Sequence, residues 1–135
     1  MTDTITGLQW QDDDAAITTD GNWTATIDYC ENTLALGGYS DWRLPNRSEL
    51  LFIVDYNSQD DSSVYSVFAN RSSNYYWSST AYSCSTANAW IVRFTSTGDN
   101  VDHSSKANDR YVRCVRGGQV DHSASLPPVI MYLLD

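Results

Sequence analysis

The spacing of apolar residues changes once along this chain, and the change limits what the chain can fold into. Between residues 23 and 36 the apolar positions recur every three or four residues, at Trp23, Ile27, Cys30 and Leu34. After residue 74 the spacing becomes two, first in the segment 75–80. A three-to-four spacing predicts a helix with one buried stripe, whereas a spacing of two predicts strands. Helices followed by strands in one short chain predict an α+β domain.

Local start and stop signals divide the two halves further. The expected first helix, 23–36, ends at Gly37-Gly38, because glycine favours the left-handed conformation that follows a helix. Asn46, with Glu49 three residues later, predicts the capping box of a second helix. The buried face of that helix is supplied by Leu50, Leu51, Ile53 and Val54. A turn leading into a short strand is expected at 6–10. Further strands are expected at 75–80, 89–94, 101–105 and 110–116, with a loop at 55–74 and a hairpin turn at 95–100.

Length and composition predict one globular domain. The chain has 135 residues, of which 41% are hydrophobic and 19% are charged. We place one folded domain at 1–117, and a linker with a short apolar C-terminal tail at 118–135. There is no run of about 18 apolar residues, so we expect no insertion into a membrane. Residues 2–11 have neither the basic start nor the apolar run of a signal peptide.

The formal net charge of −9 is unevenly distributed. Residues 1–61 hold most of the acidic side chains, whereas residues 62–120 hold six of the eight basic ones. A net-acidic chain is a poor candidate for binding nucleic acid. The locally basic second half has two interpretations that the sequence leaves open. Its basic residues either form a surface suited to a sulfated or carboxylated glycan, or they pair with the acids of the first half.

The three cysteines, Cys30, Cys84 and Cys114, leave an odd thiol in any disulfide scheme. One long-range bridge and one free thiol would suit an extracellular protein. A zinc site is not expected, because no two cysteines have the C-x-x-C spacing and the chain contains only two histidines.

Acidic runs raise the separate question of calcium. Asp12-Asp13-Asp14, with Asp20 nearby, and the loop of Asp55, Asp60 and Asp61 offer oxygen ligands but lack the spacing of a calcium loop. We therefore expect no cofactor: calcium is possible but has no motif to support it, and the metal ligands, if any, remain unassigned.

Several sequence blocks, taken in order, resemble a known family. They are Thr6-Gly7-Leu8-Gln9-Trp10, Ala25 to Cys30, Gly37-Gly38, Asp41-Trp42-Arg43-Leu44-Pro45-Asn46 with Glu49-Leu50, Tyr76-Trp77-Ser78-Ser79-Thr80, Ala89-Trp90 with Val92 and Phe94, and Val112-Arg113-Cys114-Val115-Arg116. With these blocks, about residues 5–117 resemble the bacterial domain family named after the C-terminal domain of the Legionella collagen-like adhesin. The resemblance implies a variant of the C-type lectin-like fold: two helices packed on a twisted antiparallel sheet with long loops. The first helix, the Arg-Leu-Pro turn and the second helix are also similar to the formylglycine-generating branch of that fold.

The same resemblance carries expectations about individual residues. Cys30 and Cys114 are placed like the pair that ties the first helix to the terminal strand in C-type lectin-like domains. Cys84 is then left over, either as a free thiol or as an intermolecular partner. Arg43 is expected to bond backbone carbonyls or a buried acid. Four tryptophans in the apolar patterns are expected to bury area and hold irregular loops to the sheet: Trp10, Trp42, Trp77 and Trp90.

The departures from related proteins matter for function. The calcium-dependent sugar motif of C-type lectins is absent, since Leu44-Pro45-Asn46 resembles it only in part and serves here as a helix cap. The redox cysteine pair of formylglycine-generating enzymes is also absent, because Cys84 and Cys114 are the only cysteines in the second half. We therefore expect no enzymatic activity.

The resemblance implies an exported or surface-displayed bacterial binding domain within a larger protein, and its namesake is associated with adhesion and glycosaminoglycan binding as a trimer. We accordingly predict an adhesion module, extracellular or at the cell surface, with a possible homo-oligomer. It would bind a glycan or a cell-surface protein through the loops 57–75, 81–88 and 95–110. The expected ligand-binding residues are Tyr82, Asn88, Arg93, Asp99, Asn100, Asp102, His103, Lys106, Asn108 and Arg110. Their side chains suit sugar hydroxyls, through hydrogen bonds and stacking on Tyr82.

Two other functions compete with this prediction. The chain would alternatively be a phage or retroelement-type variable receptor-binding domain that recognises a protein ligand. An enzyme related to formylglycine generation would require a reactive thiol beside a second thiol.

Overall fold

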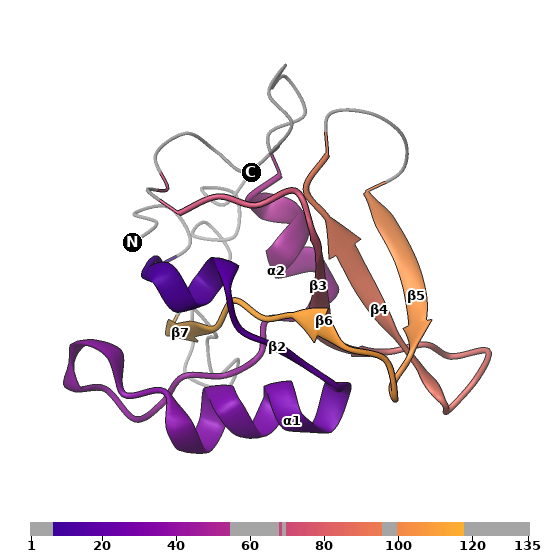
Figure 1. The fold of residues 1–135 in the computed structure, drawn as a ribbon, viewed down its shortest axis with the longest axis horizontal. Coiled ribbons are helices and arrows are strands. Elements are labelled where there is room, and N and C mark those ends of the chain that lie inside the picture. The colour runs from indigo at the N-terminus through magenta and orange to yellow at the C-terminus, as the bar shows by residue number, and fades with distance from the viewer. Residues whose placement is uncertain (1–6, 55–67, 69, 96–99, 118–135) are drawn as a thin grey trace, which may run out of the picture.

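A computed structural model describes residues 7–54, 68, 70–95 and 100–117. The expectations for the loop 55–67, for Asp99 and for the tail 118–135 lie outside these residues. The helices and strands run in the order β1 (Leu8–Trp10), β2 (Asp20–Gly21), α1 (Trp23–Asp28), α2 (Arg47–Phe52), β3 (Tyr75–Ala81), β4 (Asn88–Arg93), β5 (Val101–Ser105), β6 (Arg110–Tyr111) and β7 (Val115–Gly117), as drawn in Figure 1. Short 3-10 turns occupy Asp14–Ile17 and Leu36–Gly38. The architecture is α+β, as predicted.

The first helix forms where the apolar stripe predicts it, but its helical segment ends at Thr33, three residues before the predicted end at residue 36. Asn22 caps α1 by accepting a hydrogen bond from the Ala25 N–H at 2.8 Å. The helix then widens into a π-helical segment, Tyr29–Thr33. It closes when the Leu34 N–H donates to the carbonyl of Tyr29, and Leu34 itself is extended. Gly37 and Gly38, both at positive φ, therefore shape the following 3-10 turn and do not end the helix as expected.

The second helix confirms the predicted capping box. The Asn46 side chain accepts from the Glu49 N–H, and the Glu49 carboxylate accepts from the Asn46 N–H. Leu50, Ile53 and Val54 are buried, whereas Leu51 is only partly buried. No helix among the described residues combines the length and apolar character needed to cross a membrane.

The strands form two sheets where one antiparallel sheet was expected. Five strands pair in the order β2-β6-β3-β4-β5, and β1 pairs with β7 separately. All these pairs are antiparallel except β3 with β6, which are parallel, so the larger sheet is mixed. The expected final strand, 110–116, is split into β6 and β7 because the segment between them bonds to loops instead of strands: Val112 donates to Thr19, and the N–H of Cys114 donates to the Gln11 side chain.

The larger sheet separates two hydrophobic clusters. Neighbouring residues of a strand project to opposite faces, so the pairs Tyr76–Val92 and Trp77–Ile91 mark the two sides. Tyr76 and Val92 pack in one cluster with Leu50 of α2. Trp77 and Ile91 pack in the other, which includes Trp23 and Ile27 of α1. The two helices thus cover opposite faces, which we name the α1 face and the α2 face.

Candidate functional site

The structure divides the predicted ligand-binding residues between the two faces of the sheet. Arg93 pairs with Tyr75, which lies two residues from Trp77, and therefore belongs to the α1 face. Trp90 is the neighbour of Ile91 in β4, so its side chain projects to the opposite side of the sheet, the α2 face. His103 of β5 pairs with Trp90 and therefore lies on the same face. The predicted residues therefore do not share one face of the sheet, because neighbouring residues of these strands project to opposite sides.

On the α1 face, two arginines flank one tyrosine across three strands. Tyr75 of β3 is paired with Arg93 of β4, and the parallel register Tyr76–Tyr111 sets Arg110 of β6 beside Tyr75 on its other side. The Arg93 guanidinium carbon lies 5.3 Å from the centre of the Tyr75 ring, and that of Arg110 lies 5.5 Å from it. These are cation–π distances. Both charges are thus held against the same ring, with Arg93 exposed and Arg110 partly exposed.

A third cation lies in the turn that joins β5 to β6. The Lys106 ammonium is 4.2 Å from the centre of the Trp23 ring, at the start of α1. Backbone and side-chain bonds fix this turn, since the Trp23 N–H donates to the carbonyl of Lys106 at 3.0 Å. Ser104 then accepts from both Asn108 and Arg110, at 3.2 Å each. We call Tyr75, Arg93, Lys106 and Arg110 the cationic face.

Two other basic residues, Arg113 and Arg116, pair with acids of the first half. Arg113 lies 3.7 Å from Asp12, and Arg116 lies 2.6 Å from Asp41. Both acids belong to the first half, as one interpretation required. By contrast, Arg93, Lys106 and Arg110 form no ion pair with any residue that the structure describes. The pairing interpretation therefore holds for Arg113 and Arg116, but not for these three cations among the described residues.

On the α2 face, aromatic rings pack on one another. The Tyr82 ring stacks on that of His103 with centroids 4.0 Å apart, and both contact Trp90 edge-on. The Asn88 amide lies 3.0 Å from Nδ1 of His103. Arg47, the first residue of α2, lies over the Trp90 ring at 4.6 Å. One face of the Tyr82 ring is thus covered by His103. Trp90 is only partly buried, unlike the other three tryptophans of the sequence blocks.

The free thiol lies beside this aromatic group. Cys84 is exposed and unbridged. A hydrogen bond with Cys84, the proximity of that thiol and partial burial together raise the pKa of Tyr82 above its ordinary value.

Two of the remaining predicted residues serve the backbone. The Asn100 amide donates to the carbonyls of Arg93, at 2.6 Å, and Thr95, at 3.1 Å, which closes the hairpin between β4 and β5. Asp102 accepts from the N–H of His103 at 2.7 Å.

Among the described residues, no cluster of Asp, Glu, His or Cys side chains is arranged to hold a metal ion. Asp12 instead accepts from the Asn70 N–H at 2.9 Å.

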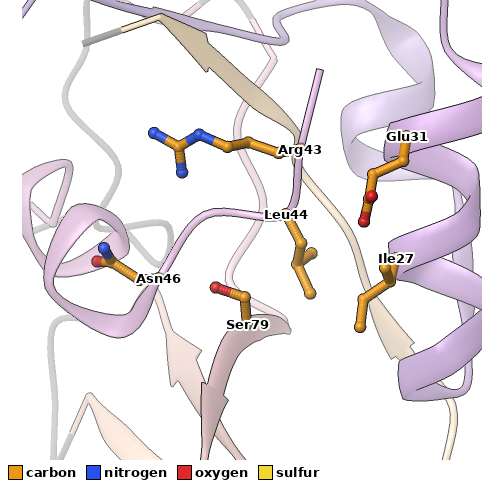
Figure 2. Close-up of a pocket in the computed structure, with 6 residues that line it drawn as sticks. All are labelled: Ile27, Glu31, Arg43, Leu44, Asn46 and Ser79. Carbon is orange, nitrogen blue, oxygen red and sulfur yellow. The ribbon is translucent and has the colours of Figure 1, made fainter. Parts of the chain in front are cut away.

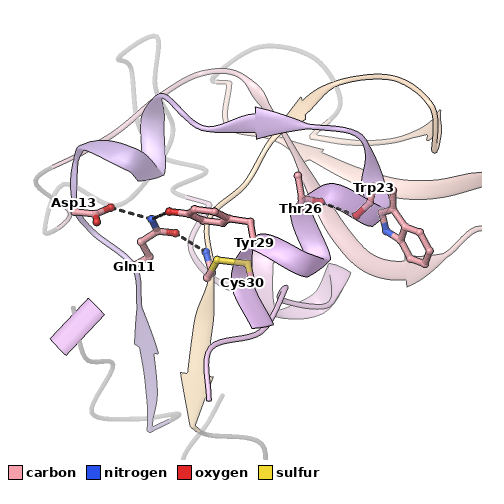
Figure 3. Close-up of a disulfide and its surroundings, with 7 residues drawn as sticks. Gln11, Asp13, Trp23, Thr26, Tyr29 and Cys30 are labelled. Atoms are coloured by element: carbon pink, nitrogen blue, oxygen red, sulfur yellow. Dashed lines mark hydrogen bonds between the residues drawn. A yellow bond between two sulfur atoms is a disulfide. The ribbon is translucent and has the colours of Figure 1, made fainter. Parts of the chain in front are cut away.

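The disulfide between Cys30 and Cys114 is present, as the resemblance implied. Figure 3 shows it beside Gln11, whose side chain connects several segments. The side-chain oxygen of Gln11, Oε1, accepts from the Cys114 N–H, and its Nε2 donates to Tyr29 Oη and Asp13 Oδ1. The bridge therefore joins the helical segment to the C-terminal strand region within a hydrogen-bonded network.

Arg43 is a structural residue, as expected. Its two terminal amino groups donate to the two carboxylate oxygens of Glu49 at 2.8 and 2.7 Å, and one also donates to the carbonyl of Gly117. Nearby, the Arg116 hydrogen bond keeps the pKa of the Asp41 carboxyl below its usual value. These contacts tie the segment before α2 to the C-terminal strand.

Sequence reasoning missed three side chains that organise these surfaces: Tyr75, Trp23 and Arg47. The period-two pattern contained a signal for Tyr75, since in such a strand it shares a face with Trp77. The contacts of Trp23 and Arg47 depend on how the helices pack, which no local pattern encodes.

Comparison with known proteins places the chain in a family. A search among curated proteins found no match. The profile of the Lcl C-terminal domain matches residues 1–116, nearly all of the described chain. The chain therefore belongs to the Lcl C-terminal domain family.

Proposed function

We propose that this domain is a noncatalytic adhesion module that binds an acidic glycan through the cationic face. The observation that carries the proposal is the arrangement of Arg93 and Arg110 on either side of Tyr75, with Lys106 in the adjoining turn. The family is an adhesion-type one, which supports the general class of function. The C-type lectin-like fold, a surface or extracellular location and a place within a larger exported protein complete the proposal, on the strength of the same family.

The local positive charge of the cationic face favours an anionic ligand. A protein of net charge −9 repels anions at long range, so attraction requires a local excess of cations. The three cations of the cationic face form no ion pair with the described residues, and each lies against an aromatic ring. A carboxylate or sulfate accepts paired hydrogen bonds from guanidinium groups. The amide of Asn108, in the same turn, provides a further polar group for hydroxyls.

The test is binding of purified domain to heparin, hyaluronan and neutral dextran, each measured at low and high salt and in the presence of calcium or chelator. We expect binding to the two acidic polysaccharides and none to dextran. Binding should weaken steeply as ionic strength rises past about 0.15 M, because exposed charges are screened. Chelator should have no effect, because the cations themselves supply the attraction.

Charge-removing variants make the test specific to this surface. Arg93→Gln with Arg110→Gln should weaken binding about tenfold or more, since two charge-assisted contacts are lost. Arg47→Gln removes one such charge from the opposite face and should bind like wild type, whereas Arg93→Gln or Arg110→Gln alone, each also one charge, should weaken binding. Equal losses in Arg47→Gln and in these single variants would show a nonspecific charge effect and overturn the proposed face. Absence of binding to every polysaccharide would overturn the glycan proposal and favour the variable protein-binding domain instead.

A further inference from the structure

A pocket away from the cationic face has the chemistry of a second binding site. It lies between the helical segment that begins with α1, the turn before α2 and the second half of β3, with a cavity volume of about 320 Å³, which is within the range of small-molecule sites. Its lining residues are Ile27, Glu31, Arg43, Leu44, Asn46 and Ser79. Figure 2 shows Glu31 and Ile27 projecting from one side, with Leu44 and Ser79 opposite them.

The walls of the pocket are held in place by the fold. Ile27 and Glu31 are four residues apart and share one side of the helical segment. That segment is anchored one residue earlier by the disulfide at Cys30. On the opposite wall, the Ser79 N–H donates to the carbonyl of Pro45 at 2.8 Å, which fixes β3 against the turn before α2.

The charge of the pocket comes from Glu31. Arg43 is already paired with Glu49 by two hydrogen bonds, and Figure 2 shows its guanidinium pointing away from Glu31. Glu31 is exposed and forms no ion pair with any other described residue. A positively charged ligand group would therefore find an uncompensated carboxylate at this wall.

The remaining groups favour hydroxyls and an apolar surface. The Asn46 side chain uses its oxygen for the Glu49 N–H, and its amide nitrogen donates to no side chain or backbone group in the described residues. The hydroxyl of Ser79 is likewise without a hydrogen bond to that part of the chain, and in Figure 2 it points toward Asn46. Ile27 and buried Leu44 supply the apolar part.

From this combination we infer that the pocket binds a small hydroxylated molecule carrying a primary ammonium group, the chemistry of a hexosamine with a free amine. The ammonium pairs with the Glu31 carboxylate, the hydroxyls contact Ser79 and Asn46, and the C–H surface of the ring rests on Leu44 and Ile27. This site is separate from the cationic face, which selects the opposite charge.

The test is a titration of the isotopically labelled domain with glucosamine, followed by amide chemical shifts. Glucose and N-acetylglucosamine are the comparison ligands, because they lack the ammonium group. We expect saturable shifts at the pocket residues with glucosamine, and binding of each comparison ligand at least fivefold weaker. Shifts of equal size and affinity with glucose would overturn the inference, as would the absence of pocket shifts at about 50 mM glucosamine.

Variants separate this site from general electrostatics and from the proposed function. Glu31→Gln should weaken glucosamine binding about tenfold, the loss expected for a charged hydrogen bond. Asp28→Asn removes the same charge from the same helical segment without lining the pocket, and should bind like wild type. Unchanged binding by Glu31→Gln would overturn the inference. Arg93→Gln with Arg110→Gln should retain glucosamine binding, so failure of one proposal leaves the other standing.

Discussion

Arg43 and Glu49 are joined by two parallel hydrogen bonds of 2.8 and 2.7 Å, although the residues lie on either side of a helix cap. The same carboxylate accepts from the N–H of Asn46, so one acidic side chain holds both the arginine and the start of α2. Arg43 also extends this connection to the carbonyl of Gly117 in β7. The pair thus couples the cap of α2 to strand β7.

Replacing this arginine by lysine should destabilise the fold despite keeping the charge. Lysine cannot form the planar double contact with Glu49. We expect Arg43→Lys to lower the free energy of unfolding by about 1–3 kcal/mol, measured by urea denaturation. The exposed Arg93→Lys should change it by less than about 0.5 kcal/mol. Equal effects of the two substitutions would contradict a special role for the pair.

Removal of the disulfide should produce the largest loss. Cys30 and Cys114 are separated by 84 residues, and chain-entropy arguments assign roughly 4 kcal/mol to a loop of that size. We expect the double replacement by serine to lower the free energy of unfolding by about that amount. Cys84→Ser, at the exposed free thiol, should be nearly neutral. If instead Cys84→Ser destabilised the domain equally, the bridge would not be the source of stability.

The buried tyrosine Tyr76 should make stability depend on alkaline pH. Burial raises the pKa of this tyrosine above its ordinary value of 10.0, and its hydroxyl donates to the carbonyl of Ala16 at 2.6 Å. A raised pKa in the folded state gives stability that is present below about pH 10 and is lost as pH rises through the folded-state value. We expect the wild type to be about 1 kcal/mol more stable than Tyr76→Phe at neutral pH, with the difference shrinking above about pH 10.

Denaturation curves for both proteins between about pH 7 and pH 11 would measure this difference. Tyr39→Phe, at an exposed ring, serves as the comparison for tyrosine removal at the surface. A wild-type advantage that stayed constant across the alkaline range would rule out Tyr76 as the responsible group.

The ring of Tyr75 should matter for ligand binding although it carries no charge. Arg93 and Arg110 both lie against it, so replacing it by leucine would leave two mobile side chains. We expect Tyr75→Leu to weaken heparin binding about threefold to tenfold, in proportion to the lost cation–π support. Tyr75→Phe keeps the aromatic face and should bind nearly as well as wild type. A loss in Tyr75→Phe equal to that in Tyr75→Leu would indicate that the hydroxyl, not the ring, is important.

The sequence allowed the elements to be predicted where local chemistry controls them. The cap at Asn46 depends on residues three positions apart, and the strands at 75–80, 89–94 and 101–105 depend on alternation within each segment. The disulfide and the structural role of Arg43 came from the family resemblance. These predictions succeeded because each depends on short-range order or on a shared pattern.

The errors have a common physical origin. The end of α1, the split between β6 and β7 and the parallel pairing of β3 with β6 all depend on contacts between distant segments, such as the Gln11 side chain on Cys114. The candidate site divided between two faces for the same reason, since a one-residue shift in register moves a side chain to the other side of a sheet. Local patterns do not contain that register.

The disulfide has a mechanical consequence. Leu8 lies opposite Gly117 in the β1–β7 pair, so a pull on the chain at these two residues peels the pair apart from its ends. Once β1 and β7 have separated, tension runs from β1 through α1 to Cys30, across the sulfur bridge, and out through Cys114. Residues 31–113 form a closed loop that carries none of this load. Tyr75, Arg93 and Arg110 all lie within that loop, so a stretched domain keeps them in an unstressed part of the chain.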